Sequence, residues 1–176
     1  MRPGAAMRVL VVADTHAPSR WRGVPRGLAD ALASGVDLIL HAGDVCRPDV
    51  LAGLAQFAPT RAVLGNNDGY DVRSWGATPW FEATLDGLAV AMIHDAGEKT
   101  GRAARMRRRF PEASVVIFGH SHSPWNALDE RTGLHLFNPG SATDPRREPF
   151  GTFGVLTIEA GGLTSTAILR ADGAAG

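Results

Sequence analysis

The stretch VVIFGHSHSPWN, residues 115–126, decides the fold. It begins with four apolar residues, three of them β-branched, which predict a short buried strand, and Gly119 ends that pattern. His120 and His122 follow on the turn that leaves the strand. Two imidazoles on one tight turn are poor core filler, because each buried ring nitrogen needs a hydrogen-bond partner. Taken alone, the segment is equally consistent with a polar loop that happens to hold two histidines.

The same succession of an apolar strand and polar residues recurs in the first half of the chain. Apolar strands are predicted at residues 7–13, 37–41 and 60–64, and helices at about 24–34 and 48–57 separate them. This β-α-β-α-β alternation predicts a parallel sheet covered by helices.

The second half has a different pattern. Residues 81–94 predict two strands joined by an Asp-Gly hairpin turn, and a helix is expected at about 100–110. Residues 125–141 and 151–170 predict further β-hairpins. The expected fold class is therefore α/β, a mixed sandwich that is parallel in its first half and antiparallel in its second.

Bulk properties narrow the class of protein. The chain has 176 residues and a formal net charge of zero, so nothing global indicates a nucleic-acid or membrane partner. The single Cys46 excludes an intramolecular disulfide and suits a reducing compartment. No apolar run approaches the about 20 residues of a membrane span, and no signal peptide is evident. We expect a soluble, cytoplasmic protein with one domain at residues 7–172 after a loose extension, residues 1–6, so that Met7 is an alternative start.

Polar side chains stand at the ends of the predicted strands. In chain order they are Asp14, His16, Asp44, Asn66, His94, His120 and His122. Gly43, Gly65 and Gly119 each directly precede one of them, where a missing Cβ lets the backbone turn sharply. Ligands of open α/β sheets gather at the carboxyl ends of the strands. Seven oxygen and nitrogen donors without a thiolate are about right for two ions that share a carboxylate, and they suit Mn, Fe, Zn, Co or Ni.

Five short motifs follow one another, each after its own predicted strand: DTH, GD, GNND, H and GHSH. In this order they resemble the calcineurin-like metallophosphoesterase superfamily, and within it the small single-domain bacterial and archaeal phosphodiesterases. The likeness runs from Met7 over nearly the whole chain and includes NPGS at residues 138–141. It implies two mixed β-sheets packed face to face as a sandwich flanked by helices, the α/β/β/α metallophosphoesterase fold.

The resemblance also implies a role for each donor. One metal ion would be held by Asp14, His16 and His122, the other by Asn66, His94 and His120, and Asp44 would bridge them. Manganese is the expected metal, with Fe, Zn, Ni or Co as alternatives. Two divalent ions, two carboxylates and a bridging hydroxide carry a formal charge of about +1, which attracts a phosphate ester. The implied function is a metal-dependent phosphodiesterase, in which that hydroxide attacks phosphorus.

The sequence departs from the larger superfamily at Asn67. Many members have a histidine directly after the asparagine ligand, where it protonates the leaving group. An amide is no acid at ordinary pH, so Asn67 is assigned to substrate binding. The roles of two residues near the ligands are left open by the sequence. His41 is expected to orient Asp44 or the loop backbone, and Asp95 either orients His94 or faces solvent.

The main alternative is a protein-binding scaffold with weak or vestigial hydrolase activity, because a eukaryotic retromer subunit has this fold with a degraded metal site. All seven donor positions are filled here, which favours the enzyme. A small phosphodiester is the expected substrate, nucleic-acid ends are not excluded, and a homo-oligomer stays open. The arginines of the helix at 100–110, Arg102, Arg105 and Arg109, predict a solvated face rather than a nucleic-acid patch.

Overall fold

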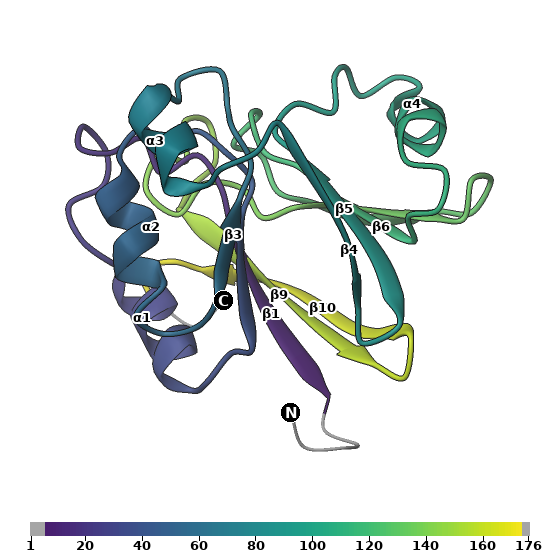
Figure 1. Cartoon of the computed structure of the whole chain (residues 1–176), viewed down its shortest axis with the longest axis horizontal. Coiled ribbons are helices and arrows are strands. Elements are labelled where there is room, and N and C mark those ends of the chain that lie inside the picture. The colour runs from purple at the N-terminus through teal and green to yellow at the C-terminus, as the bar shows by residue number, and fades with distance from the viewer. Residues whose placement is uncertain (1–5, 174–176) are drawn as a thin grey trace.

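The computed structural model describes residues 6–173, which form two five-stranded β-sheets packed face to face with helices outside (Figure 1). This is the predicted α/β/β/α sandwich. The predicted loose extension, residues 1–6, lies outside the described residues except for Ala6.

The first sheet has the strand order β10-β9-β1-β2-β3. Strands β1 to β3 pair in parallel, as their alternation with helices predicts, whereas β9 and β10 are antiparallel to their neighbours. The strands are β1 (Met7–Val12), β2 (Leu38–His41), β3 (Thr60–Ala62), β9 (Thr152–Glu159) and β10 (Gly162–Arg170).

The second sheet has the strand order β4-β5-β6-β8-β7. Its strands are β4 (Trp80–Leu85), β5 (Leu88–Ile93), β6 (Val115–Ile117), β7 (Trp125–Asp129) and β8 (Leu134–Asn138). The hairpin between β4 and β5 turns at Asp86 and Gly87, whose φ angles of 44° and 87° match the turn type that an Asp-Gly pair favours. The prediction that the second half of the chain is antiparallel was wrong in part. Strand β5 pairs in parallel with β6, and β6 pairs in parallel with β8. The helix between β5 and β6 supplies the crossover that parallel strands need.

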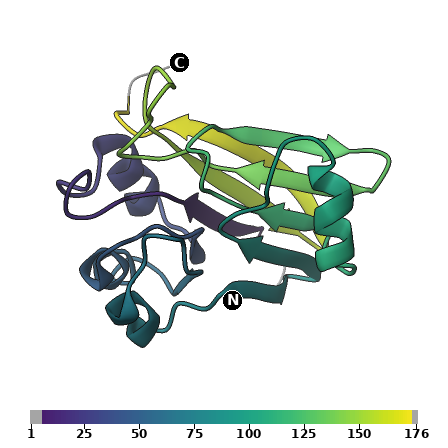
Figure 2. The same cartoon turned by 90° about the horizontal axis from the view of Figure 1, so that it is seen from above.

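The four helices within residues 6–173 lie on the outside of the sandwich, which Figure 2 shows from above. Helices α1 (Arg26–Ala33) and α2 (Pro48–Leu54) pack on the first sheet, and α4 (Arg102–Arg109) packs on the second. The sequence did not predict α3 (Tyr70–Trp75), because six residues with only Val72 buried show no helical period.

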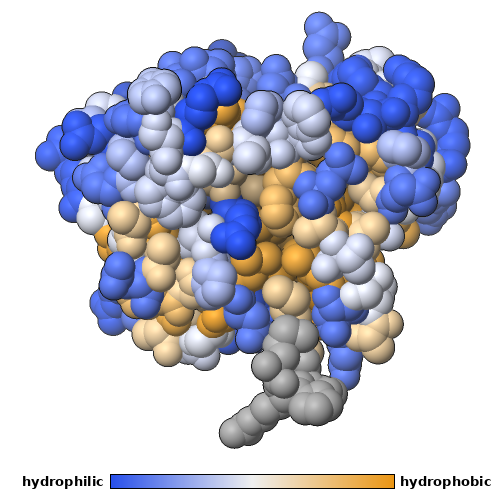
Figure 3. All heavy atoms as spheres, in the orientation of Figure 1, coloured by the Kyte–Doolittle hydropathy of each residue, from blue (hydrophilic) through white to orange (hydrophobic). Residues whose placement is uncertain are grey.

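The apolar core has three layers because both sheets are covered on both faces. Val9 and Val11 of β1 point between the sheets, while Leu10 and Val12 pack beneath the helices. This explains why β1 is apolar at consecutive positions rather than at every second one. Figure 3 shows apolar residues along the middle of one face, between the edges at β3 and β4, with hydrophilic residues on either side.

Parallel pairing brings the ends of several strands to one edge of the sandwich. Val12, near the end of β1, pairs with His41 of β2, and Met92 of β5 pairs with Ile117 of β6. The loops that follow these strands carry the candidate ligands, so the topology gathers them. None of the helices within residues 6–173 has the length and hydropathy needed to cross a membrane.

Candidate metal centre

The seven candidate ligands lie in two groups at this edge. Donor atoms of Asp14, His16 and His122 all lie within 4.8 Å of one another, and so do those of Asp44, His94 and His120. Asn66 joins the second group, because its Oδ1 is 3.2 Å from His94 Nε2 and 3.0 Å from His120 Nδ1. The donors therefore form two neighbouring groups, and Asn66 lies with the second.

Asp44 faces both groups. Its Oδ2 is 3.7 Å from His16 Nε2 in the first group and 3.4 Å from His94 Nε2 in the second. Asn67 holds this carboxylate, since its backbone N–H donates to Oδ1 (2.8 Å) and its amide Nδ2 donates to Oδ2 (2.7 Å). One carboxylate oxygen within reach of both groups is the geometry of a bridging ligand.

The loops turn at once after their strands, and the ligands themselves adopt the unusual backbone conformation. Left-handed φ angles between 46° and 67° occur at Asp14, His16, Asp44, His120 and His122. Such angles are uncommon for residues other than glycine and cluster at functional sites. They accompany the placement of Asp14 and His16 in the first donor group, and of His120 and His122 in the second and the first group respectively.

The three glycines that precede ligands serve different purposes. Gly43 has a φ of 91°, which favours glycine, as a sharp turn requires. Gly65 and Gly119 have no positive φ, and their lack of a side chain makes room for carboxylates. A Cβ at Gly65 would overlap Asp44 Oδ1, and one at Gly119 would lie 2.9 Å from Asp14 Oδ2.

The imidazoles are oriented by carbonyl groups behind them. Nδ1 of His94 lies 2.7 Å from the carbonyl oxygen of Ala42, and Nδ1 of His122 lies 2.5 Å from that of Asp144. In each neutral ring Nδ1–H donates, which leaves the Nε2 lone pair facing the centre. His122 Nε2 then meets His16 Nε2 at 3.2 Å, and His94 Nε2 meets the Asn66 oxygen at 3.2 Å. Acceptors that converge in this way require a cation or a proton between them, so the donor set fits two metal ions.

The protonation equilibria agree with this fit at Asp14, His16 and His122. The pKa of His94 is raised instead, because its contact with Asp44 outweighs the burial that lowers it. Burial, reinforced by the nearby Asp44, raises the pKa of Asp14 to about 7. Burial lowers the pKa of His16 and His122, which favours the neutral imidazole that binds metal. Burial opposes ionisation of Asp44 as well, but the neighbouring His94 ring and the two hydrogen bonds from Asn67 outweigh it and hold the pKa of this carboxyl well below its usual range. A bound cation would take the place of the proton on Asp14.

Several supporting residues were not predicted from the sequence. Asp68 accepts the backbone N–H groups of Asp44, Cys46 and Gly65 and so ties two ligand loops together. Ser141 donates to the carbonyl oxygen of Asp14. Asp68 is the last residue of the GNND motif and Ser141 the last of NPGS. The motifs therefore contained both residues, but the sequence did not indicate their roles.

Residues next to the ligands have ordinary structural roles. His41 is fully buried, its ring contacts Thr15 Oγ1 (3.1 Å) and accepts the N–H of Gly43, and burial lowers its pKa to about 3. It thus supports the loop backbone, one of the two expected roles. Asp95 is exposed and accepts the N–H of Gly97, so it does not orient His94. Burial raises the pKa of the Cys46 thiol to about 11, which keeps it protonated.

The prediction of a solvated arginine face on α4 holds for Arg109, which is exposed, but not for Arg102 and Arg105, which are half-buried. Arg102 donates to the carbonyl oxygen of Gly97, and Arg105 donates to those of Ala96 and Glu98. Arg109 lies with its guanidinium 4.5 Å from the ring centroid of Trp80. These side chains fasten loops and cover aromatic rings, a use of arginine that a helical pattern alone does not reveal.

Comparison with known proteins identifies the family. Residues 7–161 match the family model of the calcineurin-like phosphoesterase superfamily domain. The chain belongs to this superfamily. A probable metallophosphoesterase of Methanothermobacter thermautotrophicus is 37% identical over 142 residues, 80% of each chain. Another from Methanocaldococcus jannaschii is 33% identical over 147 residues, 81% of this chain and 72% of that protein.

Solved structures show the same fold. Vacuolar Protein Sorting 29 from Cryptosporidium parvum matches this chain with a TM-score of 0.77 at 17% identity, over 94% of this chain and 98% of that one. A structure described as a novel archaeal phosphodiesterase matches with a TM-score of 0.71 at 21% identity, over 93% of this chain and 100% of that one.

Proposed function

We propose that this metallophosphoesterase hydrolyses phosphodiesters at a dinuclear metal centre. The observation that carries the proposal is the position of Asp44 Oδ2, which lies within 3.7 Å of His16 Nε2 and 3.4 Å of His94 Nε2 and joins two donor groups into one centre. The proposed ligands are Asp14, His16, Asp44, Asn66, His94, His120 and His122.

The proposed metal is manganese, and Fe, Zn, Co and Ni suit the same imidazole, carboxylate and amide donors. Two bound divalent ions supply a water-derived nucleophile at neutral pH and stabilise the charge that develops on the phosphate oxygens. The protein ligands include only two carboxylates, which leaves the centre with a positive charge that attracts an anionic ester.

Residues around the centre would position the substrate. Asn67 uses one hydrogen of its Nδ2 group at Asp44, and we propose that the other reaches a phosphate oxygen. Two exposed arginines flank the first donor group: Arg20 Nε is 3.5 Å and Arg146 Nε is 3.7 Å from the carboxylate of Asp144. Asp144 in turn holds His122 through its carbonyl oxygen. These two guanidinium groups against one carboxylate favour approach of a phosphodiester.

A protein-binding scaffold of the same fold is the alternative, and the likeness to Vacuolar Protein Sorting 29 supports it at the level of the fold alone. The filled donor positions and their convergent lone pairs favour the hydrolase. The single cysteine is in keeping with a reducing, cytoplasmic compartment. We propose a small phosphodiester as the substrate.

The test combines metal analysis of the purified protein with a panel of phosphomonoesters and phosphodiesters. Two transition-metal ions per chain and faster turnover of aryl diesters than of the matching monoesters are expected. A preference for monoesters would contradict the phosphodiesterase assignment, and the absence of hydrolysis from protein loaded with two ions would favour the scaffold.

A further inference from the structure

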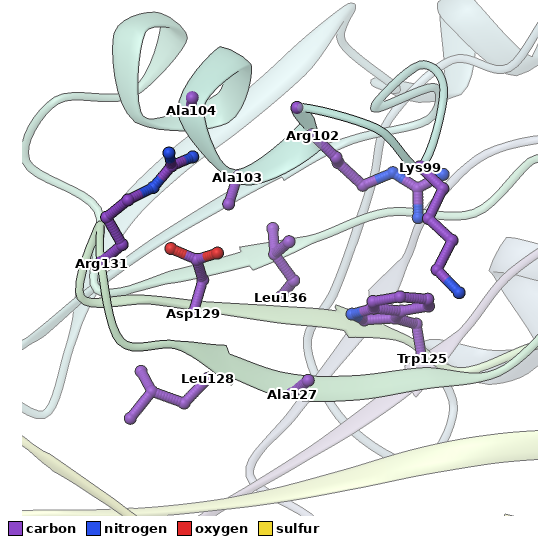
Figure 4. Close-up of a pocket in the computed structure, with 11 residues that line it drawn as sticks. Lys99, Arg102, Ala103, Ala104, Trp125, Ala127, Leu128, Asp129, Arg131 and Leu136 are labelled. Atoms are coloured by element: carbon purple, nitrogen blue, oxygen red, sulfur yellow. The ribbon is translucent and has the colours of Figure 1, made fainter.

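A separate cavity of about 210 Å³ lies between α4 and β7. Figure 4 shows Arg102 and Ala103 of α4 on one side, Trp125 and Asp129 of β7 on the other, and Leu136 of β8 at the floor. The residues that line this cavity include no candidate metal ligand.

Trp125 presents an unsatisfied donor to this cavity. Its Nε1 is buried and has no hydrogen-bond partner within residues 6–173. In Figure 4 the nitrogen edge of the indole points to the interior, toward Leu136, while Lys99 and Arg102 lie over the ring. An indole N–H donates and cannot accept, and a buried donor without a partner costs about 1–3 kcal/mol. Within residues 6–173 no acceptor atom therefore lies within hydrogen-bond reach of this N–H.

The charged side chains that line the cavity point to the nature of that acceptor. Three are cationic, Lys99, Arg102 and Arg131, and one is anionic, Asp129, which leaves a formal surplus of two positive charges. The three cations come from three segments: the loop before α4, α4 itself and the turn between β7 and β8. This concentration is notable in a chain whose net charge is zero.

Two of these side chains have their positions set by the protein. Arg102 donates through Nε and Nη2 to the carbonyl oxygen of Gly97 and lies 4.8 Å from the ring centroid of Phe118. Asp129 Oδ1 accepts both the N–H and the hydroxyl of Thr132, so this carboxylate is engaged in shaping the turn. The three cationic side chains are donors, and a ligand oxygen in the cavity would face them and the N–H of Trp125.

We propose that this cavity is a binding site for a small oxyanion, a phosphate or carboxylate group carried by a small molecule. One oxygen accepts the hydrogen bond of Trp125 Nε1, and the surrounding cations balance its charge. Leu136 and Ala103 provide an apolar wall for the rest of the ligand. This site goes beyond the proposed hydrolysis, since it shares no residue with the metal centre.

The indole N–H of Trp125 is itself the probe. The chain contains four tryptophans, and proton–nitrogen correlation spectra of the full-length protein resolve one indole signal for each, with Trp125→Phe giving the assignment. Inorganic phosphate and acetate are titrated separately at constant ionic strength, with chloride as the reference anion. We expect a saturable shift of the Trp125 signal with at least one of the two oxyanions.

Two arginine variants of equal charge provide the control. Arg131→Gln removes a cation that lines the cavity, whereas Arg108→Gln removes an exposed one on α4 that does not line it. Arg131→Gln is expected to weaken binding about fivefold and Arg108→Gln to leave it unchanged. A response to phosphate alone or to acetate alone supports the site and identifies the group that it prefers. No saturable shift with either anion, or equal weakening in both variants, would overturn the proposal.

Discussion

The two donor groups of the metal centre have similar chemistry but differ in their burial. In the first group Asp14 and His122 are 0% and 1% exposed, and Ser141 and Asp144 hold them from behind. In the second group Asp44 and His94 are buried, but His120 and Asn66 are exposed on their loops. One half of the centre is thus part of the core, and the other half opens to solvent.

This difference in burial predicts different roles for the two donor groups. Side chains that the core holds in place bind an ion with little loss of conformational entropy, whereas exposed side chains must be ordered on binding. We therefore expect the first group to hold its ion more tightly, and the second to provide the open positions where a substrate enters.

Removing Asp44, the ligand that both donor groups share, should have the largest effect on metal binding and hydrolysis, because both proposed ions depend on it. Asp44→Ala is expected to lose at least one metal ion and to reduce hydrolysis by more than about 10³-fold, the scale of metal-ion stabilisation of the reacting charge. Metal analysis and steady-state kinetics measure both. Asp49→Ala, an exposed carboxylate in α2, is the control. Two ions and normal turnover in Asp44→Ala would contradict the bridging assignment.

The second prediction concerns how the leaving group is protonated on the solvent-exposed side of the centre. Asn67 lies there, and its amide cannot act as a general acid. General acids typically contribute about 10²–10⁴-fold, so their absence should be felt mainly with alkoxide leaving groups. We expect a steep fall of log kcat/KM as the leaving-group pKa rises, and Asn67→His to flatten that slope. If the slope is flat in the natural protein while the chemical step limits the rate, another residue donates the proton.

The two histidines of the GHSH turn provide a matched pair. His122→Ala removes a buried ring and its bond to Asp144, so metal-free protein should lose about 2–4 kcal/mol of unfolding free energy. His120→Ala removes an exposed ring and should change it by no more than about 0.5 kcal/mol. Denaturant titrations of both metal-free variants measure this. Equal losses would show that burial does not distinguish the groups.

The two donor groups should release their metal ions to a chelator at different rates. With a competing chelator, metal release is expected in two phases, the faster one from the exposed second group. His120→Ala should remove the fast phase, and His122→Ala the slow one. Release of both ions in a single phase from the natural protein would mean that the groups bind with similar strength.

The smallest effect concerns the flanking cations. Arg146→Gln is expected to raise KM for a phosphodiester about fivefold with kcat unchanged, since an exposed charge contributes up to about 1 kcal/mol. Arg147→Gln is the matched control from the next position in the chain, also exposed. A fall in kcat rather than a rise in KM would place Arg146 in the chemical step instead of in substrate attraction.

The candidate site was more predictable than the details of the fold. Each ligand directly follows an apolar run that was legible as a strand, and one family resemblance related the motifs to one another. Helix α3 and the parallel pairing of β6 with β8 were missed. A helix of six residues is too short to show a helical period of apolar residues. The local sequence pattern also does not reveal which strands far apart in the chain will pair.

The sequence by itself determined the class of the fold and which seven side chains could bind metal, because periodicity and donor chemistry are local properties. Only the tertiary structure decided that Asp44 reaches both groups, that Asp68 ties their loops together and that one group is buried while the other is exposed. Those properties depend on how parallel strands align and on which loops the core covers. Both arise from packing between residues that are distant in the chain.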